Sequence, residues 1–516
     1  MRYRPVEHPF VPPPALREGE ARKSVIIVGA GPVGLAAALE LANHKVECVV
    51  LDDNNTVSTG SRAICWSKRS LEIFDRIGIG GRAVEKGVVW KVGRTFHRDV
   101  EMFNFDLLPE KGHKRPAFIN LQQYYVEEYL IDAALASPRV DLRFLNRLTG
   151  AVNHDDCVEV TIDTPAGAYR LECEYLIACD GARSSLRTLL GLDLVGEHFE
   201  ERFLIADIEM KANFPSERRF WFEPEFHNGQ SALLHKQPDN IYRIDLQLGW
   251  DADPEVERQE ENVAPRIRRV VGTRDFRIDW VSVYTFQCRR LNSFLHGRIV
   301  FAGDAAHVVS PFGARGGNSG LQDVDSLCWR LAAVLDRKAP AELLRAYDRE
   351  RTFAADENIC HSSRTTKFMT PADGMERVFR DQLFKLARKA PFARAWINSG
   401  RLSSPCVYPD MPDDAPMLPG RARPGSVAPD APQETRWLLD SLGKDIAMVG
   451  FNVPPPRIPE VRSFRAETNE CVRQRYLGDE RQAVYLVRPD QVIAGRWLQP
   501  SECQLRRALN SILGLN

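Results

Sequence analysis

The hydrophobic residues of this chain follow two different patterns. Residues 24–52 run as an apolar stretch, a glycine-rich turn, a second apolar stretch of helical length and a third, VECVVLD. This order predicts a β-α-β unit of a parallel sheet. From Phe203 to Gln287 apolar and polar residues alternate instead, as in RFLIADIEM and YRIDLQLGW, which predicts an antiparallel sheet. The segment RIVFAGDAAH then returns to the first pattern, so we expect the parallel-sheet domain to be interrupted and resumed.

These patterns and the proline content divide the chain into six parts. Residues 1–22 hold five prolines and residues 401–432 hold eight, which is typical of an extended arm and a linker. The arm lies either along the body or along a neighbouring subunit. Beyond the linker, AVYLVRPDQVIAGRW reads as strands of a separate small α/β domain. The predicted parts are the arm 1–22, the parallel-sheet domain 23–195 and 291–400, the antiparallel sheet 196–290, the linker 401–432 and the small domain 433–516.

Composition narrows the classes of partner. The chain has 516 residues and a formal net charge of −1, which argues against binding to nucleic acid or acidic lipid and favours a small molecule. Its eleven cysteines include no Cys-x-x-Cys pair, so we expect neither a metal site nor a disulfide framework, and a cytoplasmic location. Glycines, Pro32 and Glu40 interrupt the apolar stretch 25–42, which excludes a signal peptide as the favoured interpretation. We expect no membrane span.

The turn after the first predicted strand carries a Gly-x-Gly-x-x-Gly motif. Gly29 permits the tight turn, Gly31 lets the backbone approach a pyrophosphate, and Gly34 lets helix and strand pack closely. Asp52 follows 23 residues after Gly29, where a carboxylate can accept hydrogen bonds from a ribose. Strand, turn, helix, strand and acid agree, so the segment predicts dinucleotide binding.

Two later segments repeat the strand-and-turn arrangement. YLIACDGARSSLR leads a strand into Asp180 and Gly181, and RIVFAGDAAH leads one into Gly303 and Asp304 before the loop PFGARGGN. Either turn alone is equally well explained as a structural turn. Together with the first motif they indicate one distributed binding site.

With these three motifs in this order, residues 24–510 resemble the class A flavin monooxygenases, the para-hydroxybenzoate hydroxylase-like family, and especially its phenol hydroxylase and 3-(3-hydroxyphenyl)propionate hydroxylase branch. The resemblance implies an α/β fold: a Rossmann-like FAD-binding domain interrupted by an antiparallel-sheet substrate domain, plus a C-terminal thioredoxin-like α/β domain without redox chemistry. The cofactor-binding residues that it implies, with the loop residues, are Gly29, Gly31, Gly34, Asp52, Arg62, Gln123, Asp180, Gly181, Gly303, Asp304, Pro311, Gly316, Gly317 and Asn318.

The resemblance also implies a reaction. FAD is reduced by NADPH or NADH, O2 forms a flavin C4a-hydroperoxide, and a hydroxyl group passes to a small phenolic compound, in aromatic catabolism. The amides at the helix start near Asn318 suit the anionic edge of reduced flavin. Arg315 is a departure: relatives often carry an uncharged residue there, so it either tunes the flavin, holds an anionic substrate or is a solvated loop residue. We expect a homodimer or higher homo-oligomer.

Two residues of the alternating region are candidates for catalysis. The hairpin SALLHKQPDNIYRIDLQL resembles the substrate-facing hairpin of the family, which aligns Arg243 with an arginine that steers flavin movement and His235 with a substrate contact. His235 is our candidate base for a phenol. Ordinary strand-surface positions are the alternative for both residues. We expect His307 to orient a loop, and the sequence does not show which faces Tyr242, Tyr284 and Gln287 occupy.

Two other functions stay open. One is a different flavin monooxygenase reaction, such as Baeyer-Villiger oxidation, oxidative decarboxylation or hydroxylation of a polyketide or antibiotic. The other is a flavin dehydrogenase or oxidase that does not use NADPH.

Overall fold

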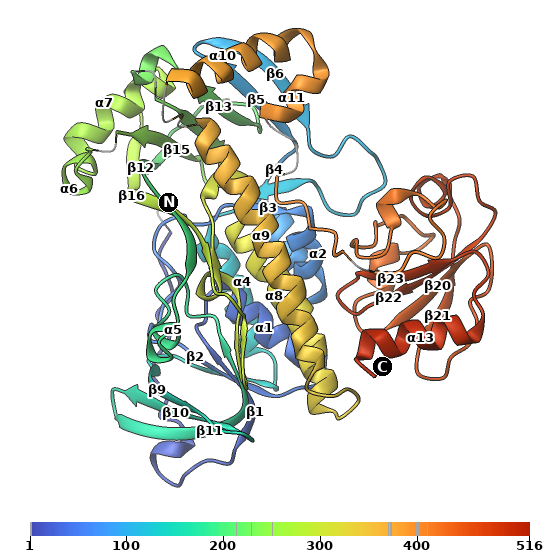
Figure 1. The fold of residues 1–516 in the computed structure, drawn as a ribbon. Coiled ribbons are helices and arrows are strands. Elements are labelled where there is room, and N and C mark those ends of the chain that lie inside the picture. Colours follow the sequence, from blue (N-terminus) through green and yellow to red (C-terminus); the bar gives the residue numbers. More distant parts are fainter. Residues whose placement is uncertain are drawn as a thin grey trace.

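The structure of the chain is a computed structural model, which describes residues 3–212, 214–228, 230–249, 251–369, 371, 374–397, 402–409 and 411–515. Within these ranges, no helix combines the length and apolar character needed to cross a membrane. Figure 1 shows two joined sheet regions, crossed by long helices, with a smaller C-terminal unit at one side.

The first sheet has a parallel core of five strands. Its strand order is β17-β18-β11-β1-β2-β8, and the pairs from β18 to β8 are all parallel. Helix α1 (Pro32–Asn43) connects β1 to β2, which confirms the predicted β-α-β unit. Strand β18 arrives from beyond the antiparallel region, so the predicted interruption is also confirmed. The strands are β1 (Lys23–Val28), β2 (Cys48–Leu51), β8 (Val140–Arg143), β9 (Arg147–Asn153), β10 (Val158–Thr164), β11 (Gly167–Ala178), β17 (Leu295–His296) and β18 (Ile299–Phe301).

The second sheet is largely antiparallel, as the alternation predicts. Its order is β19-β16-β12-β15-β14-β13-β5-β6. Strands β5 and β6 come from the part of the chain before the second motif, and β5 pairs with β13 in parallel. The second sheet therefore includes strands that lie outside the predicted range 196–290. The strands are β5 (Val92–His97), β6 (Val100–Asp106), β12 (Val195–Glu209), β13 (Arg218–Phe222), β14 (Ala232–Lys236), β15 (Ile241–Leu248), β16 (Arg277–Arg290) and β19 (His307–Val308).

Helices cover both sheets and join them. Helix α8 (Gly316–Leu335) packs on α1, and α9 (Leu343–Met369) runs beside α8 toward the second sheet (Figure 1). There α10 (Gly374–Lys389) lies against β6, and α11 (Pro391–Ile397) packs on α10. A small third sheet has the order β3-β7-β4. The remaining elements here are β3 (Cys65–Ser67), β4 (Val88–Trp90), β7 (Phe118–Asn120), α2 (Lys68–Arg76), α3 (Gly80–Lys86), α4 (Gln123–Leu135), α5 (Ser185–Leu189), α6 (Pro254–Glu257) and α7 (Glu260–Val271).

The C-terminal unit has its own mixed sheet. The order is β21-β20-β22-β23, with one parallel and two antiparallel pairs. Its hydrophobic core includes Phe451, Tyr476 and Tyr485 and is separate from the main core. This arrangement agrees with the predicted small α/β domain. Its elements are β20 (Ala447–Phe451), β21 (Arg462–Ala466), α12 (Glu470–Val472), β22 (Ala483–Val487), β23 (Ile493–Trp497) and α13 (Glu502–Leu513).

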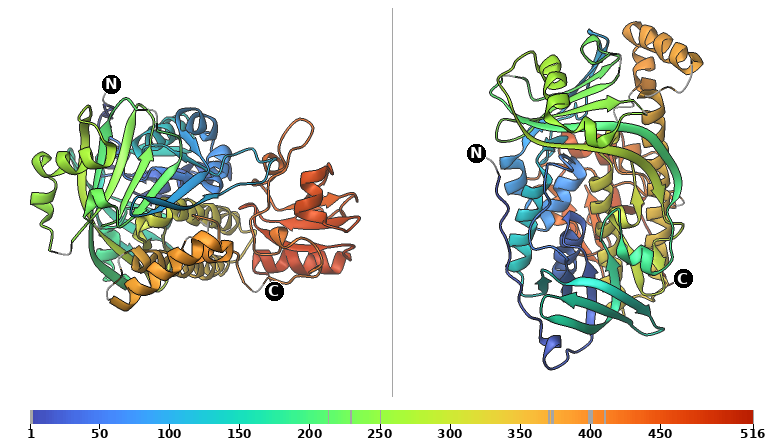
Figure 2. Two further views of the ribbon diagram at one scale, coloured as in Figure 1. Left: turned by 90° about the horizontal axis from the view of Figure 1, so that it is seen from above. Right: turned by 90° about the vertical axis from the view of Figure 1, so that its left-hand side faces the viewer.

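The N-terminal arm lies along the body of the same chain. Tyr3 stacks on Tyr124 with ring centroids 4.0 Å apart, and His8 stacks on Phe144 at 4.4 Å. The right-hand view of Figure 2 shows the arm, in dark blue, running from the N-terminus down one side of the molecule to its lower end. Of the two placements open from the sequence, the structure shows the one along the body.

Candidate active site

The predicted motifs meet at one edge of the parallel sheet. Strands β1, β2, β11 and β18 are neighbours and parallel, so their carboxyl ends lie at the same edge. Gly29 follows β1, Asp52 follows β2, Asp180 follows β11 and Gly303 follows β18. In open α/β sheets, ligands bind at this edge.

The glycine turn has the backbone geometry that a dinucleotide cradle needs. Gly29 has a φ of +101°, and a Cβ there would lie 2.5 Å from the carbonyl oxygen of Cys179. A Cβ at Gly34 would collide with the carbonyl oxygen of Gly29. At Gly31, by contrast, a Cβ would meet no protein atom within 4 Å. Gly29 and Gly34 are thus required by the fold, while the space beside Gly31 is free for a ligand, and this turn fits FAD.

Asp52 fastens the turn to the second strand. Its Oδ2 accepts a hydrogen bond from the amide of Ala30 at 2.5 Å, and its Oδ1 accepts one from the amide of Asn54 at 2.8 Å. Burial raises the pKa of the Asp52 carboxyl above its usual value. The carboxylate therefore lies beside the turn, where a ribose would pass.

The other two acids also lie at this edge. The Oδ2 of Asp180 accepts from the amide of Leu186 at 3.0 Å, while its buried Oδ1 has no hydrogen-bond partner among the described residues. Gly181 has a φ of +79°. Asp304 is accessible to solvent. The protein around its carboxyl nevertheless reduces its hydration and so raises its pKa above the usual value. An unpartnered buried oxygen and an accessible carboxylate again fit a polar ligand such as FAD.

One short segment, Ser61–Ser67, joins several predicted site residues. Its residue Arg62 is exposed and has a φ of +42°. Gln123 accepts from the segment's backbone at Ala63, at 3.2 Å. Arg243 donates to the carbonyl oxygen of Arg62. The structure thus brings Arg62, Gln123 and Arg243 to one place, although they are far apart in the sequence.

Asn318 connects the same segment to helix α8. Its Oδ1 accepts from the amide of Ser67 at 2.8 Å, and its Nδ2 donates to the carbonyl oxygens of Cys65 at 2.8 Å and Ala314 at 2.6 Å. It is 2% exposed. The Asn318 side chain therefore holds the loop 311–315 in place, and the backbone amides at the start of α8 are left to face a ligand.

The loop before α8 combines an exposed proline with a buried cation. Pro311 is exposed, whereas Arg315 is 6% exposed and its Nη1 donates to the Oδ1 of Asn358 at 2.8 Å. Of the interpretations of Arg315 from the sequence, the solvated loop residue is wrong. A Cβ at Gly317 would touch the ring of Trp66, and one at Gly316 would meet its nearest atom only at 3.8 Å.

A cavity of about 410 Å³ opens beside this loop. Its walls come from β5, β6 and β13 of the second sheet, from Phe312, Gly313 and Arg315, and from the end of α9. The aromatic residues that line it are Phe105, Phe220, Phe222, Phe312, Phe368 and Trp396. A cavity of this size and lining suits a small aromatic ligand.

Comparison with known proteins now identifies the family. The family model described as "FAD binding domain" matches residues 22–362. The chain belongs to this family. A flavin-dependent monooxygenase of Mycobacteroides abscessus is 32% identical over 340 residues, covering 64% of this chain and 71% of the relative. A 3-(3-hydroxy-phenyl)propionate/3-hydroxycinnamic acid hydroxylase of Mycolicibacterium gilvum is 28% identical, covering 83% and 75%.

Solved structures agree with the fold. The flavin-dependent monooxygenase PieE, in complex with FAD and substrate, superposes with a TM-score of 0.81 at 21% identity, covering 96% of this chain and 100% of that one. The OxyS anhydrotetracycline hydroxylase of Streptomyces rimosus has a TM-score of 0.74 at 25% identity, covering 96% and 99%. The resemblance stated from the sequence is confirmed, and the chain is an FAD-dependent aromatic monooxygenase.

The electrostatics of this monooxygenase do not favour His235 as the base. His235 is 4% exposed and does not line the cavity. Its Nδ1 lies 3.9 Å from the Sγ of Cys65. Burial, and after it the charges of Arg218 and Arg243, lower the pKa of His235 well below its usual value. A histidine this weakly basic is a poor acceptor for a phenol proton.

His307 occupies a buried polar network. Its Nε2 lies 2.6 Å from the Oδ2 of Asp323, which also accepts from the amide of Gly303 at 2.9 Å. Arg351 donates to the other oxygen of Asp323 at 2.7 Å. Burial acts to raise the pKa of the Asp323 carboxyl, but the neighbouring His307 and Arg351 outweigh this effect and lower the pKa below its usual value. His307 thus orients the Gly303 turn, as its sequence context suggests.

Apart from Arg315 and its loop, the residues that line the cavity were not predicted from the sequence. Arg218, Phe220 and Phe222 share one face of β13, because successive side chains on a strand point to opposite faces. The alternation RRFWF signalled a strand, but nothing in it tells which face is inward. Tyr242 is buried with its hydroxyl donating to the carbonyl oxygen of Ala212 at 2.7 Å, so it does not reach the cavity. Tyr284 is 38% exposed.

Proposed function

We propose that the enzyme hydroxylates a small phenolic compound, with NADPH or NADH as reductant and O2 as the oxygen donor. The observation that carries the proposal is the aromatic-lined cavity beside the loop 311–315. In that position, a bound ring would lie between the second sheet and the segment that we expect to hold the flavin. Phenyl and indole side chains favour a flat aromatic ligand and exclude water from it.

In this proposal FAD supplies hydride acceptance and oxygen activation, and the chain supplies position and charge. The glycine turn and Arg62 would bind the pyrophosphate. Asp52 would hold hydroxyl groups of the ribose, and Asp304 and Gln123 those of the ribityl chain. The first amides of α8 stabilise the anionic edge of the reduced ring system. Arg243 lies against the Arg62 segment, where it can restrain movement of the cofactor.

We further propose a homodimer or higher homo-oligomer and a reducing, cytoplasmic location. All eleven cysteines are free, which agrees with a compartment where disulfides do not persist.

A substrate screen tests the function. The FAD-loaded enzyme is mixed with NADPH or NADH and a panel of phenols, with cyclohexanols of similar size as matched non-aromatic controls. We expect some phenols, and none of the controls, to accelerate flavin reduction without oxygen and to gain one oxygen atom in air, as measured by product mass. A flavin that is reduced by a non-aromatic donor and is indifferent to NADPH and NADH would instead identify a dehydrogenase or oxidase.

A further inference from the structure

Arg218 is a buried cation with no carboxylate partner. It opens β13 and is 8% exposed. Its Nη2 donates a hydrogen bond of 3.3 Å to the carbonyl oxygen of Phe312. In the part of the chain that the structure describes, no ion pair joins Arg218 to an acidic residue.

The acidic side chains near Arg218 are already paired with other cations. Glu217 accepts from the Nε of Arg94 at 2.7 Å and from the Nε of Arg219 at 2.9 Å. Asp245 accepts from the Nε of Arg243 at 2.7 Å. Burial lowers the pKa of Arg218, and the charge of Arg243 adds to this, although Cys65 and Asp245 act in the opposite direction. A buried charge that lacks a partner is unfavourable, so Arg218 is set to receive an anion from outside the chain.

The wall of the cavity carries further positively charged side chains. Arg94, Arg315 and Arg364 line it together with Arg218. Of the described residues in its wall, none is acidic. Low-dielectric walls that carry one sign of charge concentrate ligands of the opposite sign.

We propose that the substrate binds as an oxyanion whose charged oxygen is received by the guanidinium of Arg218, with its aromatic ring between Phe220, Phe222 and Phe312. This inference rests on the proposed function and adds the charge state of the substrate and the residue that selects it. Arginine suits the role because its planar guanidinium can donate to both oxygens of a carboxylate or to the single oxygen of a phenolate, and it stays protonated at physiological pH.

Two kinds of substrate group supply this chemistry. One is a carboxylate on the aromatic ring or its side chain. The other is the phenolate of the substrate itself: the O–H bond breaks, the electron pair stays on oxygen and the proton passes to water. A bound phenolate would also explain how a phenol is activated here without a histidine of ordinary basicity.

Binding to the oxidised, FAD-loaded enzyme tests the proposal without turnover. The probes are 4-nitrophenol, whose phenolate is yellow, benzoate, and the uncharged 4-nitroanisole. We expect the wild-type enzyme to bind 4-nitrophenol as the phenolate at a pH where the free compound is neutral, or to bind benzoate, or both. We expect Arg218→Gln to weaken the anion that binds by tenfold or more and to change the affinity for 4-nitroanisole less than twofold. Arg218→Lys should give an intermediate affinity.

Arg219→Gln is the matched control. It makes the same chemical change one residue along, on the opposite face of β13, and should leave all three affinities unchanged. Loss of 4-nitrophenolate alone identifies the phenolate as the group received, and loss of benzoate alone identifies a carboxylate. Equal loss of the uncharged probe, or wild-type enzyme that binds 4-nitrophenol only as the neutral phenol and does not bind benzoate, would overturn the proposal. Because no reductant is present, these results stand apart from whether the enzyme hydroxylates phenols.

Discussion

Gly29 and Gly31 are two residues apart, yet a side chain at each would meet different surroundings. At Gly29 it would press on the backbone of Cys179, with a φ that disfavours any other residue. At Gly31 it would meet no protein atom within 4 Å. The fold therefore requires Gly29, whereas Gly31 leaves open space beside the turn, as is expected of a turn that binds a dinucleotide.

Alanine substitutions separate these two roles. Gly29→Ala should lower the yield of folded protein and its melting temperature. Gly31→Ala should fold with a melting temperature of the FAD-free protein within about 2 °C of wild type, since the change costs the apoprotein a few tenths of a kcal/mol at most. Its affinity for FAD, measured by fluorescence titration, should fall at least tenfold. Unimpaired FAD binding by Gly31→Ala would show that the pyrophosphate lies elsewhere.

Asp207 gives the second sheet a pH-dependent stability. It is 3% exposed and accepts from the Nε2 of Gln237 at 3.0 Å. Burial raises its pKa from 3.8 to about 6, against the lowering effect of Arg243. The folded protein thus holds this proton to higher pH than the unfolded chain does. Its contribution to stability is present below pH 4 and is lost as pH rises through 6.

Asp207→Asn should remove that dependence. A shift of about two pKa units corresponds to about 3 kcal/mol, so the variant should exceed wild type in unfolding free energy by up to that amount at pH 7.5 and match it near pH 4. Melting temperatures across this range provide the measurement. If the two proteins keep a constant difference at every pH, the Asp207 carboxyl does not titrate as described.

At the scale of elements, the segment Ser61–Ser67 and helix α8 are held together by one amide side chain. Asn318 accepts from a backbone amide and donates to two backbone carbonyl oxygens, all in a buried environment. Neither a hydrophobic side chain nor a carboxylate offers both kinds of group. The position of the first turn of α8 therefore depends on the Asn318 side chain. The backbone amides of that turn, which would face a ligand, take no part in these bonds.

Asn318→Asp tests this dependence. The substituted carboxylate would face the carbonyl oxygens of Cys65 and Ala314, at a cost on the order of 3 kcal/mol, offset in part by the favourable position of a negative charge at a helix start. We expect a lower melting temperature and a purified protein with less bound FAD, read from its visible absorption. Asn318→Ala, which removes the bonds without adding a charge, should retain more FAD than Asn318→Asp; the reverse order would contradict this account.

The hydrophobic pattern of the sequence predicted those elements whose structure depends on residues close together in the chain. The strand, turn and helix around Gly29 follow from consecutive residues, and so do the ends of β11 and β18. The pairing of β5 with β13 was not predictable, because the two strands are more than a hundred residues apart and parallel, and no short turn sets their register. The role that we propose for Arg218 depends on that same pairing. The sequence showed that Arg218 lies on a strand. It did not show that the side chain points inward or that it has no acidic partner among the described residues, because both depend on how β5 and the loop 311–315 pack around it.

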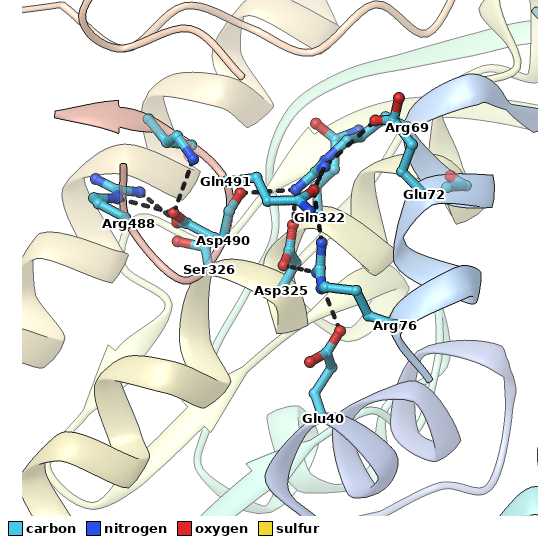
Figure 3. Close-up of polar contacts among 12 residues, drawn as sticks. Glu40, Arg69, Glu72, Arg76, Gln322, Asp325, Ser326, Arg488, Asp490 and Gln491 are labelled. Carbon is cyan, nitrogen blue, oxygen red and sulfur yellow. Dashed lines mark hydrogen bonds and ion pairs between the residues drawn. The ribbon is translucent and has the colours of Figure 1, made fainter. Parts of the chain in front are cut away.

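At the scale of the whole molecule, the C-terminal unit docks on the FAD-binding domain through buried charges. Figure 3 shows Asp325 of α8 between Arg69 and Arg76 of α2, with Gln491 and Asp490 of the C-terminal unit on the other side. Arg69 donates to Asp325 at 2.6 Å, to Gln491 at 2.6 Å and to the carbonyl oxygen of Asp490 at 2.7 Å. The two units therefore share one hydrogen-bonded network.

Asp325→Asn should loosen this docking more than its small chemical change suggests. It removes the carboxylate that two buried guanidinium groups share and leaves Arg69 with Glu72 and Arg76 with Glu40. Breaking a buried pair completely costs about 3–5 kcal/mol, so we expect a loss below that range. Amide hydrogen exchange should then speed up in β22 and β23, while the FAD spectrum stays close to that of wild type. Asp336→Asn, at the residue directly after α8, is the control: its ion pair with Lys338 is exposed and contributes about 0–1 kcal/mol. Similar exchange rates in the two variants would mean that apolar contacts, rather than the charge network, hold the C-terminal unit in place.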